Sequence, residues 1–371
     1  MKLNKFVNKT ILITGGTGSL GKKITSILLN KYNLKKIIIF SRDEQKQVKL
    51  KEVFNNNKKL RYFIGDVRDK SRVNFALKEV NYVIHAAALK HVPIAEYNPF
   101  ETIKTNILGS QNVIDCSMEN NVEKVIALST DKASSPTNLY GATKLAADKL
   151  FIAANNYSVD SKKKFSVVRY GNVFGSRGSI VPLLLNKNLK KLNLTDTKMT
   201  RFNISLEKSA LFVIDCLEKM QGGELFVPKI PSYKILDLIS AINPKIKIVC
   251  TGLRPGEKLN EEMISQNDAF NTIELKDKYI ICPNSEFNQK NINLTGNITS
   301  TRIIPGNIQD YTTSIGTTGQ VLTKSTSGIV WSNIPTYLTP GLNDVLLVGN
   351  TVYSDISIIY PDNGIFSTSY E

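Results

Sequence analysis

The sequence predicts an α/β protein: a doubly wound parallel sheet, a smaller C-terminal substrate lobe, and a β-rich tail. Apolar runs of strand type alternate with helical segments about every 20–30 residues through the first part of the chain. A glycine-rich turn joins the first strand directly to the first helix. The composition shifts after Pro283, where lysine and glutamate nearly disappear. We place the domains at residues 1–170, with 205–228 returning to the sheet, and at 171–283 and 284–371.

Composition excludes several classes of protein. No apolar run approaches the ~20 residues that a membrane-spanning helix needs, and residues 1–9 are polar and basic, unlike a signal peptide. The four cysteines are scattered without a C-x-x-C motif, and there are two histidines, so we expect free thiols and no metal site. These features predict a cytoplasmic protein with no membrane partner.

The formal net charge is +16, and it lies in the body, because the residues from 291 onward hold two basic and five acidic side chains. A basic body is typical of nucleic-acid-binding proteins. Here many lysines form scattered pairs, such as Lys22 with Lys23, without interleaved aromatic residues. We therefore favour solvated lysines and a phosphate-bearing small ligand, and we expect no nucleic-acid partner.

A buried strand at Thr10–Thr14 leads into a glycine-rich turn and a helix over residues 22–29. Glycines let the backbone turn tightly and approach a pyrophosphate, which then lies at the helix N-terminus. The spacing G-x-x-G-x-x-G is a variant of the dinucleotide-binding fingerprint, and its place between strand and helix indicates a Rossmann-type domain. The predicted cofactor-binding residues of this turn are Gly15, Thr17, Gly18, Ser19, Leu20 and Gly21.

The second and third strands, over residues 36–40 and 60–64, end in residues that would select the cofactor. An acid after the second strand suits the free ribose of NAD, whereas an arginine suits the 2′-phosphate of NADP. Both types occur here, and we favour NADP, with NAD left open. The residues concerned are Ser41, Arg42, Asp43 and Lys46, with Asp66 and Val67 expected beside the adenine.

A fourth strand over residues 81–85 runs into a turn of small residues. Ala86 and Ala87 would allow close approach of the ribose and nicotinamide, although tight strand–helix packing explains alanines equally well. Lys90 is expected in the cleft, within reach of both cofactor and substrate. A helix is predicted over residues 99–116 and the fifth strand over 122–128.

The polar stretch after the fifth strand carries the chemistry. Thr130, Asp131 and Lys132 are expected at the carboxyl end of a strand, where open α/β sheets bind ligands. A helix is predicted over residues 143–154, and the four-residue spacing of Tyr140 and Lys144 puts them on one helix face. A lysine ammonium beside a phenol favours the phenolate, which makes Tyr140 a usable proton acceptor. A Y-x-x-x-K spacing alone is most often ordinary helix surface.

Beyond a strand over residues 165–169 the alternation breaks up into a smaller lobe. A helix over residues 206–220 and a strand over 224–227 return to the sheet, and the lobe is assembled from segments 180–189, 195–204 and 246–262. A charged turn at residues 254–258 is suited to a diphosphate. The predicted substrate-binding residues are Lys90, Asn172, Arg201, Arg254 and Glu257.

The tail is rich in Thr, Ser, Asn, Gly and Ile and contains the only tryptophan, Trp331. Short alternating runs at residues 320–323 and 344–348, separated by Gly, Asn and Pro turns, predict strands. The segments 316–331 and 343–350 resemble repeats of viral fibre and tail proteins, which trimerise or attach to other fibre parts. A disordered low-complexity extension is the alternative.

Residues 1–283 resemble the soluble UDP-N-acetylglucosamine 4,6-dehydratases that invert C5, which belong to the extended short-chain dehydrogenase/reductase superfamily. The resemblance covers a long series of motifs, and the tail has no counterpart in that family. The motifs include T-G-G-T-G-S-L-G at residues 14–21, F-S-R-D-E at 40–44, G-D-V-R-D at 65–69, H-A-A-A-L-K-H-V-P at 85–93, S-T-D-K-A at 129–133, N-L-Y-G-A-T-K at 138–144 and R-P-G-E-K at 254–258.

The resemblance implies a mechanism and a set of partners. Tyr140, activated by Lys144, takes the proton of the C4 hydroxyl while hydride leaves C4 for a tightly bound, recycled NADP. Lys132 removes the C5 proton and returns it to the opposite face, and Asp131 assists loss of the C6 hydroxyl as water. Thr130 is expected to bond the reacting hydroxyl or its oxyanion. The resemblance further implies a UDP-sugar substrate and a homo-oligomer, a dimer or a hexamer.

Two other functions stay open at this point. A C4-epimerase or a reductase of the same superfamily would need Tyr140 and Lys144 but would have no use for Asp131 with Lys132. A structural virion component, with the fibre-like tail mediating assembly, is an alternative of another class. A viral origin would place the protein in the host cytoplasm.

Overall fold

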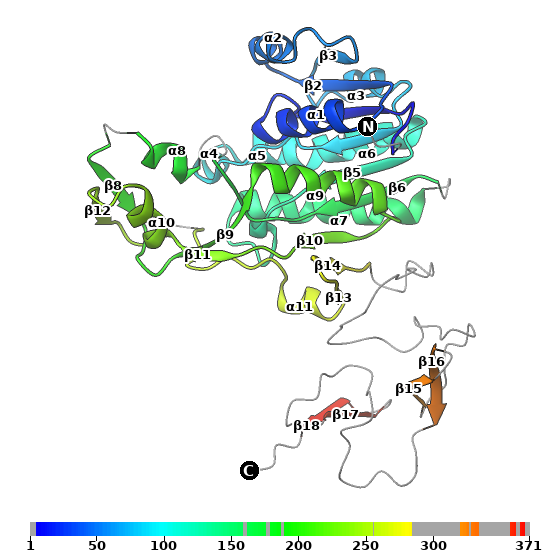
Figure 1. Cartoon of the computed structure of the whole chain (residues 1–371), viewed down its shortest axis with the longest axis vertical. Helices are drawn as coiled ribbons and strands as arrows, with labels where there is room; N and C mark the ends of the chain where they lie inside the picture. The colour runs from blue at the N-terminus through cyan, green and yellow to red at the C-terminus, as the bar shows by residue number, and fades with distance from the viewer. Residues whose placement is uncertain are drawn as a thin grey trace. The chain divides into compact units, whose positions relative to one another are not determined.

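A computed structural model describes residues 5–158, 162–175, 179–186, 189–254 and 256–283, and four strands of the tail. The chain divides into two compact units, Met1–Gln266 and Asn267–Glu371. Figure 1 shows the elements of both units along the chain. No helix among the described residues is both long and apolar enough to cross a membrane.

The first unit is built on a parallel sheet whose strand order is β10-β6-β5-β4-β1-β2-β3. The order runs outward in both directions from the neighbours β1 and β4, so the carboxyl ends of these two strands flank a topological switch point. The strands are β1 (Thr10–Thr14), β2 (Lys36–Ser41), β3 (Leu60–Ile64), β4 (Tyr82–His85), β5 (Lys124–Leu128), β6 (Lys164–Val168) and β10 (Leu225–Pro228). The predicted doubly wound sheet is confirmed.

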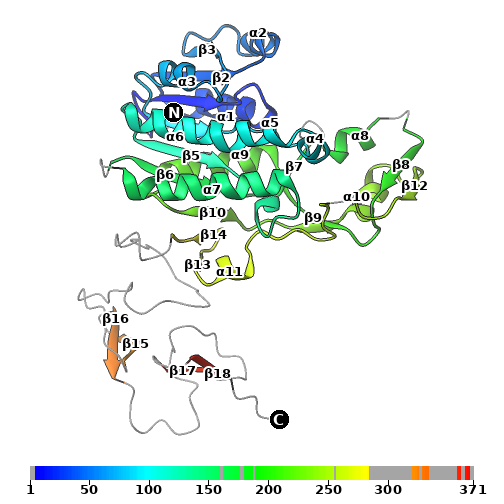
Figure 2. The same cartoon turned by 180° about the vertical axis from the view of Figure 1, so that it is seen from behind.

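Helices cover both faces of this sheet. Figure 1 shows α1 and α9 in front of the strands, and Figure 2, seen from behind, shows α6 and α7 over the opposite face. These two layers bury the apolar strands, among which Ile11, Ile13 and Val83 have no exposed surface. The helices around the sheet are α1 (Ser19–Lys31), α2 (Glu44–Val53), α3 (Lys70–Ala76), α4 (Val92–Tyr97), α5 (Pro99–Ile103), α6 (Gly109–Glu119), α7 (Leu139–Tyr157) and α9 (Leu206–Lys219).

Two predicted helices differ from the structure. The segment predicted as one helix over residues 99–116 is α5, a π-helical turn at Lys104–Leu108, and α6. The π turn buries Thr105 and Asn106 and holds the Asn106 amide against the neighbouring loop. Helix α7 begins at Leu139, earlier than predicted, because the side chain of Asn138 caps it by accepting a hydrogen bond from the backbone N–H of Gly141 (2.8 Å).

A second cluster of elements lies beside the carboxyl end of the sheet and has its own apolar core. Strand β9 pairs with β7 and β11, and β8 pairs with β12. Its core consists of Leu184, Leu192, Leu194, Met199, Ile235, Ile239 and Ile246. The elements are β7 (Asn172–Phe174), α8 (Ile180–Leu184), β8 (Lys191–Leu194), β9 (Thr200–Ser205), β11 (Ser232–Lys234), α10 (Ile235–Ile242) and β12 (Lys247–Cys250). The proposed domain boundaries themselves stay predictions.

The described part of the second unit consists of short elements. Strands β13 (Thr272–Glu274) and β14 (Lys278–Ile281) form an antiparallel hairpin after the short helix α11 (Gln266–Ala269). In the tail, β15 (Gln320–Ser325) pairs with β16 (Gly328–Asn333), and β17 (Ser357–Tyr360) pairs with β18 (Gly364–Ser367). The predicted strand at residues 320–323 is confirmed, whereas the one at 344–348 lies outside the described residues.

Candidate active site

A cleft of about 770 Å³ opens at the carboxyl end of the sheet, between the glycine-rich turn and the smaller cluster of elements. It is lined by every residue that the sequence predicts for binding cofactor or substrate. The predicted catalytic residues line it as well, apart from Asp131, whose side chain is fully buried. The fold thus brings the predicted residues together from segments that are far apart along the first unit.

The glycine-rich turn is packed so closely that side chains are excluded from it. Gly15 has a φ of 64°, and a Cβ atom there would stand 2.9 Å from the carbonyl oxygen of Ala86. A Cβ on Gly21 would stand 2.6 Å from the Cα of Gly16. Helix α1 follows with Gly18 at its N-cap, where no side chain occupies the free N–H groups. These N–H groups and the helix dipole suit a pyrophosphate.

A buried hydrogen-bond network fixes the alanine turn opposite these glycines. The hydroxyl oxygen of Thr14 accepts hydrogen bonds from the N–H groups of Ala86 and Ala87, both 3.1 Å long. Its proton is therefore donated to Nδ1 of His85 (2.9 Å), whose Nε2 faces the hydroxyl of Ser110 (3.2 Å). Burial lowers the pKa of His85 to about 3, with a further contribution from Lys144, so the ring is neutral.

Residues at the end of β2 place one half-exposed arginine, Arg42, in the cleft. The carboxylate of Asp43 caps α2, accepting from the N–H of Lys46 (2.9 Å), and also pairs with the Lys46 ammonium. The buried Ser41 accepts a hydrogen bond on Oγ from Gln47 Nε2 (3.0 Å). The side chain of Arg42 is half exposed, with Nη1 3.5 Å from the carboxylate of Asp66. The carboxylate of Asp43 is thus engaged in capping α2, whereas the half-exposed Arg42 lines the cleft.

Asp66, expected beside the adenine, is held by neighbouring arginines. Its Oδ2 accepts from Nε (2.9 Å) and Nη2 (2.7 Å) of Arg68, and its Oδ1 from the N–H of the same residue (3.0 Å). Burial alone would raise the pKa of Asp66, but the hydrogen bonds from Arg68 and the charge of Arg42 hold it below its ordinary value. The carboxylate is therefore ionised and fixed in place.

Asn106, in the π turn, positions the loop that carries Lys90. Its amide accepts from the N–H of Leu89 (2.8 Å) and donates to the carbonyl oxygen of the same residue (2.9 Å). It also donates to the hydroxyl of Thr143 on α7 (3.0 Å). The buried amide therefore links the Lys90 loop to the helix that carries Tyr140 and Lys144.

Tyr140 and Lys144 lie one turn apart on α7, and both side chains line the cleft. Burial raises the pKa of the Tyr140 phenol above its ordinary value, and a hydrogen bond with Thr130 opposes this. Burial lowers the pKa of the Lys144 ammonium, and the negative charge of Asp148 opposes that. Activation of the phenol by Lys144 thus stays a prediction, and the structure adds Thr130 as a partner of the phenol.

A buried pair lies behind these two residues. Asp148, one further turn along α7, accepts from the hydroxyl of Ser129 (2.6 Å) and lies 3.4 Å from Nη2 of Arg169. Burial raises the pKa of Asp148, against the lowering effect of Arg169 and Lys144. The pair brings a carboxylate close to Lys144 and ties α7 to the ends of β5 and β6.

Thr130, Asp131 and Lys132 form a hydrogen-bonded group on a single 3-10 turn (Asp131–Ala133) directly after β5. The Thr130 hydroxyl donates to Oδ1 of Asp131 (2.9 Å), and Nζ of Lys132 donates to the same oxygen (3.1 Å). Helix α7 packs tightly on this turn, because a Cβ on Gly141 would stand 2.2 Å from the carbonyl oxygen of Lys132. The turn and the helix are therefore held as one rigid pair.

Sequence reasoning missed one member of this group, Glu261. Its Oε1 lies 3.1 Å from Nζ of Lys132, and its side chain is 4% exposed. Lys132 therefore lies between two buried carboxylates, those of Asp131 and Glu261. No local pattern in the sequence pointed to Glu261, because it lies in an irregular segment far along the chain from Lys132.

The residues predicted to bind the substrate are distributed around the outer part of the cleft. Asn172 lies on β7 and is half-buried, and Arg254 is exposed. Arg201 is buried, and its guanidinium donates to the carbonyl oxygens of Thr200 (2.6 Å) and Leu259 (3.0 Å). Glu257 accepts from the hydroxyl of Thr195 (2.9 Å). Their roles in substrate binding stay predictions.

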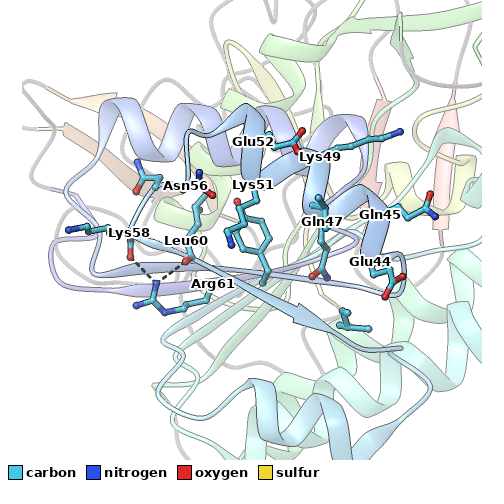
Figure 3. A pocket seen from close by; sticks show the side chains of 14 residues that line it. Glu44, Gln45, Gln47, Lys49, Lys51, Glu52, Asn56, Lys58, Leu60 and Arg61 are labelled. Carbon is cyan, nitrogen blue, oxygen red and sulfur yellow. Dashed lines mark hydrogen bonds between the residues drawn. The ribbon is translucent and has the colours of Figure 1, made fainter.

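A second hollow of about 1170 Å³ lies between α2 and the edge strand β3, away from these residues. Figure 3 shows its lining, with Glu44, Lys49, Lys51 and Glu52 on the helix. On the strand side, Nη1 of Arg61 donates to the carbonyl oxygens of Lys58 and Leu60, each at 2.8 Å (Figure 3). Its charged groups do not converge on a common point, so the cleft at the switch point is the candidate site.

Comparisons with known proteins indicate the family to which the chain belongs. A UDP-N-acetylglucosamine 4,6-dehydratase (inverting) from Campylobacter jejuni is 58% identical over 288 residues, covering 77% of this chain and 86% of that protein. A UDP-glucose 4-epimerase from Rickettsia bellii is 45% identical over 285 residues, covering 74% and 83%. The crystal structure of Pen from Bacillus thuringiensis, 41% identical, superposes with a TM-score of 0.73 over 76% of this chain and 89% of its own.

A dTDP-glucose 4,6-dehydratase from Streptomyces venezuelae shares the fold at 19% identity, with a TM-score of 0.62 over 68% of this chain and 88% of its own. The family model of polysaccharide biosynthesis proteins matches residues 11–283, which include the whole cleft and leave out the tail. The chain belongs to this family of polysaccharide biosynthesis proteins and has the fold of the extended short-chain dehydrogenases/reductases.

Proposed function

We propose that the protein is a 4,6-dehydratase of UDP-N-acetylglucosamine. It oxidises C4, removes water across C5 and C6 and inverts C5, giving a 4-keto-6-deoxy sugar nucleotide. One observation carries the proposal: a buried carboxylate and a lysine, Asp131 and Lys132, lie in hydrogen-bond contact beside the Tyr140–Lys144 pair. An oxidation needs the second pair alone, whereas an elimination needs an acid and a base in addition. The inverting dehydratase from Campylobacter jejuni supports this assignment.

The residues of the cleft fit a nicotinamide dinucleotide. The turn at Gly15 and Gly21 has no room for a Cβ atom, and without side chains there the protein backbone can approach the pyrophosphate of the cofactor closely. When bound there, NADP would accept hydride from C4 of the sugar and return it to C6. NADP is favoured over NAD because Arg42 is exposed in the cleft while the acid Asp43 is engaged in capping α2.

Oxidation at C4 requires a base for the hydroxyl proton. Tyr140 serves as that base, and the cation of Lys144 stabilises its phenolate. Burial raises the pKa of the phenol above its ordinary value, and the hydrogen bond with Thr130 opposes that effect.

Elimination requires a base at C5 and an acid at the C6 oxygen. The ketone at C4 acidifies the C5 proton, and the Lys132 amine removes it as the C6–O bond breaks. Asp131 gives a proton to the departing hydroxide, which leaves as water. After the hydride has returned to C6, the sugar must present the opposite face of C5 to Lys132, which then returns a proton there. The amine and the acid arise together when one proton passes from Lys132 to Asp131 across their 3.1 Å contact.

Thr130 provides a path that returns Tyr140 and Asp131 to their starting protonation states after each cycle. Tyr140 gains the proton of the C4 hydroxyl, while Asp131 loses one to the leaving water. The hydroxyl of Thr130 is hydrogen-bonded to the phenol of Tyr140 and donates to Oδ1 of Asp131 (2.9 Å). A proton can therefore pass from Tyr140 through Thr130 to Asp131, which restores both groups without solvent.

A C4-epimerase is the second candidate, because the relative from Rickettsia bellii carries that name. An epimerase returns the hydride to C4 and has no task for Asp131 and Lys132. UDP-N-acetylglucosamine deuterated at C4 separates the two functions. A dehydratase moves the label to C6 of a 4-keto product, whereas label found only at C4 would contradict the proposed function.

A further inference from the structure

We propose that Glu261 is a positioning residue of the elimination step. Together with Asp131 it contacts the Lys132 amine from two sides and so holds it in place to act on C5. This role rests on the proposed function. Nζ of Lys132 lies 3.1 Å from Asp131 Oδ1 and 3.1 Å from Glu261 Oε1, so its place is set from two sides. A lysine side chain has four rotatable bonds, and one contact alone would leave Nζ free to swing.

The second contact comes from a segment outside the catalytic turn, residues 256–263, which we call the strap. The strap begins at Gly256, whose carbonyl oxygen accepts from Thr137 Oγ1 (3.1 Å) and Asn138 Nδ2 (2.9 Å), at the N-terminus of α7. Further along, Nζ of Lys258 donates to the carbonyl oxygen of Ser134 (2.8 Å). The strap is therefore fastened to the turn that carries Lys132 and to the helix that carries Tyr140.

The far side of the strap is fastened to β9 and to the buried pair behind the site. Arg201 donates through Nη1 to the carbonyl oxygen of Leu259 (3.0 Å) and through Nη2 to that of Lys258 (3.1 Å). Nη1 of Arg169 donates to the carbonyl oxygen of Met263 (3.2 Å). These contacts leave Glu261 little freedom, so its carboxylate presents a fixed anion to Lys132.

Charge gives Glu261 a second effect on Lys132. Its Oε1 lies 4.0 Å from Nε of Arg201 and 3.1 Å from Nζ of Lys132, so one carboxylate separates two cations. Without that carboxylate, Arg201 would repel the protonated form of Lys132 toward the open cleft. The other oxygen, Oε2, is buried without a hydrogen-bond partner, as is Oδ2 of Asp131. Each carboxylate thus keeps an acceptor oxygen free, and Nζ is held on the pair of inner oxygens.

If Glu261 only positions Lys132, its loss should slow one step of the reaction and not the other. A general loss of structure would lower the rates of both steps. Hydride transfer from C4 depends on Tyr140 and Lys144, which Glu261 does not contact. Proton removal at C5 depends on Lys132, which it does. The Glu261→Gln variant keeps the shape of the side chain and removes its charge, so it should retain the first step and lose the second.

The test follows both steps in a single turnover in deuterated water. Enzyme loaded with NADP is mixed with UDP-N-acetylglucosamine, reduced nicotinamide is followed by absorbance, and deuterium at C5 by NMR. For Glu261→Gln we expect nicotinamide reduction at the wild-type rate, accumulation of the reduced form, and C5 exchange slowed at least ~10-fold. Glu261→Asp keeps the charge on a shorter arm and should fall between the two.

A matched control is Glu262→Gln, the same change at an exposed neighbour whose carboxylate accepts from Ser135 Oγ (3.0 Å). It should leave both steps unchanged. Wild-type C5 exchange in Glu261→Gln would overturn the role. So would equal losses in both steps with a lower melting temperature, or a variant that fails to fold while Glu261→Asp behaves as wild type. Failure of the wild type itself to exchange C5 would instead refute the proposed function, and this role with it.

Discussion

Lowering the pH should destabilise the protein through His85 in a way that one substitution removes. The ring is 1% exposed, and its pKa is about 3 in the folded protein against 6.5 for an exposed histidine. The unfolded chain therefore takes up a proton below pH 6.5 that the folded chain refuses until about pH 3. The stabilisation is complete above pH 6.5 and is lost as the pH falls.

The two pKa values give the size of the effect. Between pH 7.5 and pH 5.5 the free energy of unfolding should fall by about 1.4 kcal/mol through this histidine, and by ~1.4 kcal/mol for each further pH unit down to about pH 3. Urea unfolding at a series of pH values measures the total loss, to which acidic residues contribute as well. The His85→Gln variant isolates the histidine, since Gln retains a donor and an acceptor but does not titrate.

The expected result is a shallower loss of stability in the variant, by about 1.4 kcal/mol over the interval from pH 7.5 to pH 5.5. Identical slopes in wild type and His85→Gln would show that His85 does not contribute to the pH dependence of stability. They would mean that the ring takes up a proton in the folded state, and that the neutral network through Thr14 to Ala86 and Ala87 is not the form that shapes the cofactor turn.

Three substitutions test other parts of the site. Thr130→Val removes the hydroxyl between Tyr140 and Asp131 and should slow turnover roughly 10-fold or more, with Thr130→Ser near wild type in the same steady-state assay. Arg42→Ala should weaken NADP binding roughly 10- to 100-fold and leave NAD binding nearly unchanged, as titration of nicotinamide fluorescence would show; equal losses for both would contradict the assignment. Gly21→Ala, with Cβ 2.6 Å from Gly16 Cα, should lower the free energy of unfolding by roughly 1–3 kcal/mol, and unchanged melting would show that the turn can relax.

The sheet and much of the cleft could be predicted because their signals are local. Buried parallel strands are continuous apolar runs, so β1 was placed at its observed bounds. The glycine-rich turn at residues 15–21 and the spacing of Tyr140 and Lys144 fix backbone and helix geometry within a few residues. The start of α7 at Leu139 also had a local signal, because Asn138 is a helix-capping residue. The predicted start at residue 143 did not take this cap into account.

The rest of the site depends on contacts between distant segments. Glu261 reaches Lys132 only because the strap crosses from β9 to the catalytic turn, and nothing in the sequence around it indicates that path. In the π turn at Lys104–Leu108, Asn106 likewise bonds the backbone of Leu89, a contact between segments that no local pattern indicates. Arg201 illustrates the converse, since a basic residue predicted for a diphosphate has much of its guanidinium occupied by carbonyl oxygens of the strap.

The central claim, that Lys132 and Asp131 make this protein a dehydratase that acts at C5, has a direct test. UDP-N-acetylglucosamine is incubated with the enzyme and NADP in deuterated water, and the product is examined by NMR at C5 and C6. We expect a 4-keto-6-deoxy sugar with the inverted configuration at C5 and a solvent deuterium there, and no such product from Lys132→Ala. A product that retains the substrate's C5 hydrogen and differs only at C4 would contradict it.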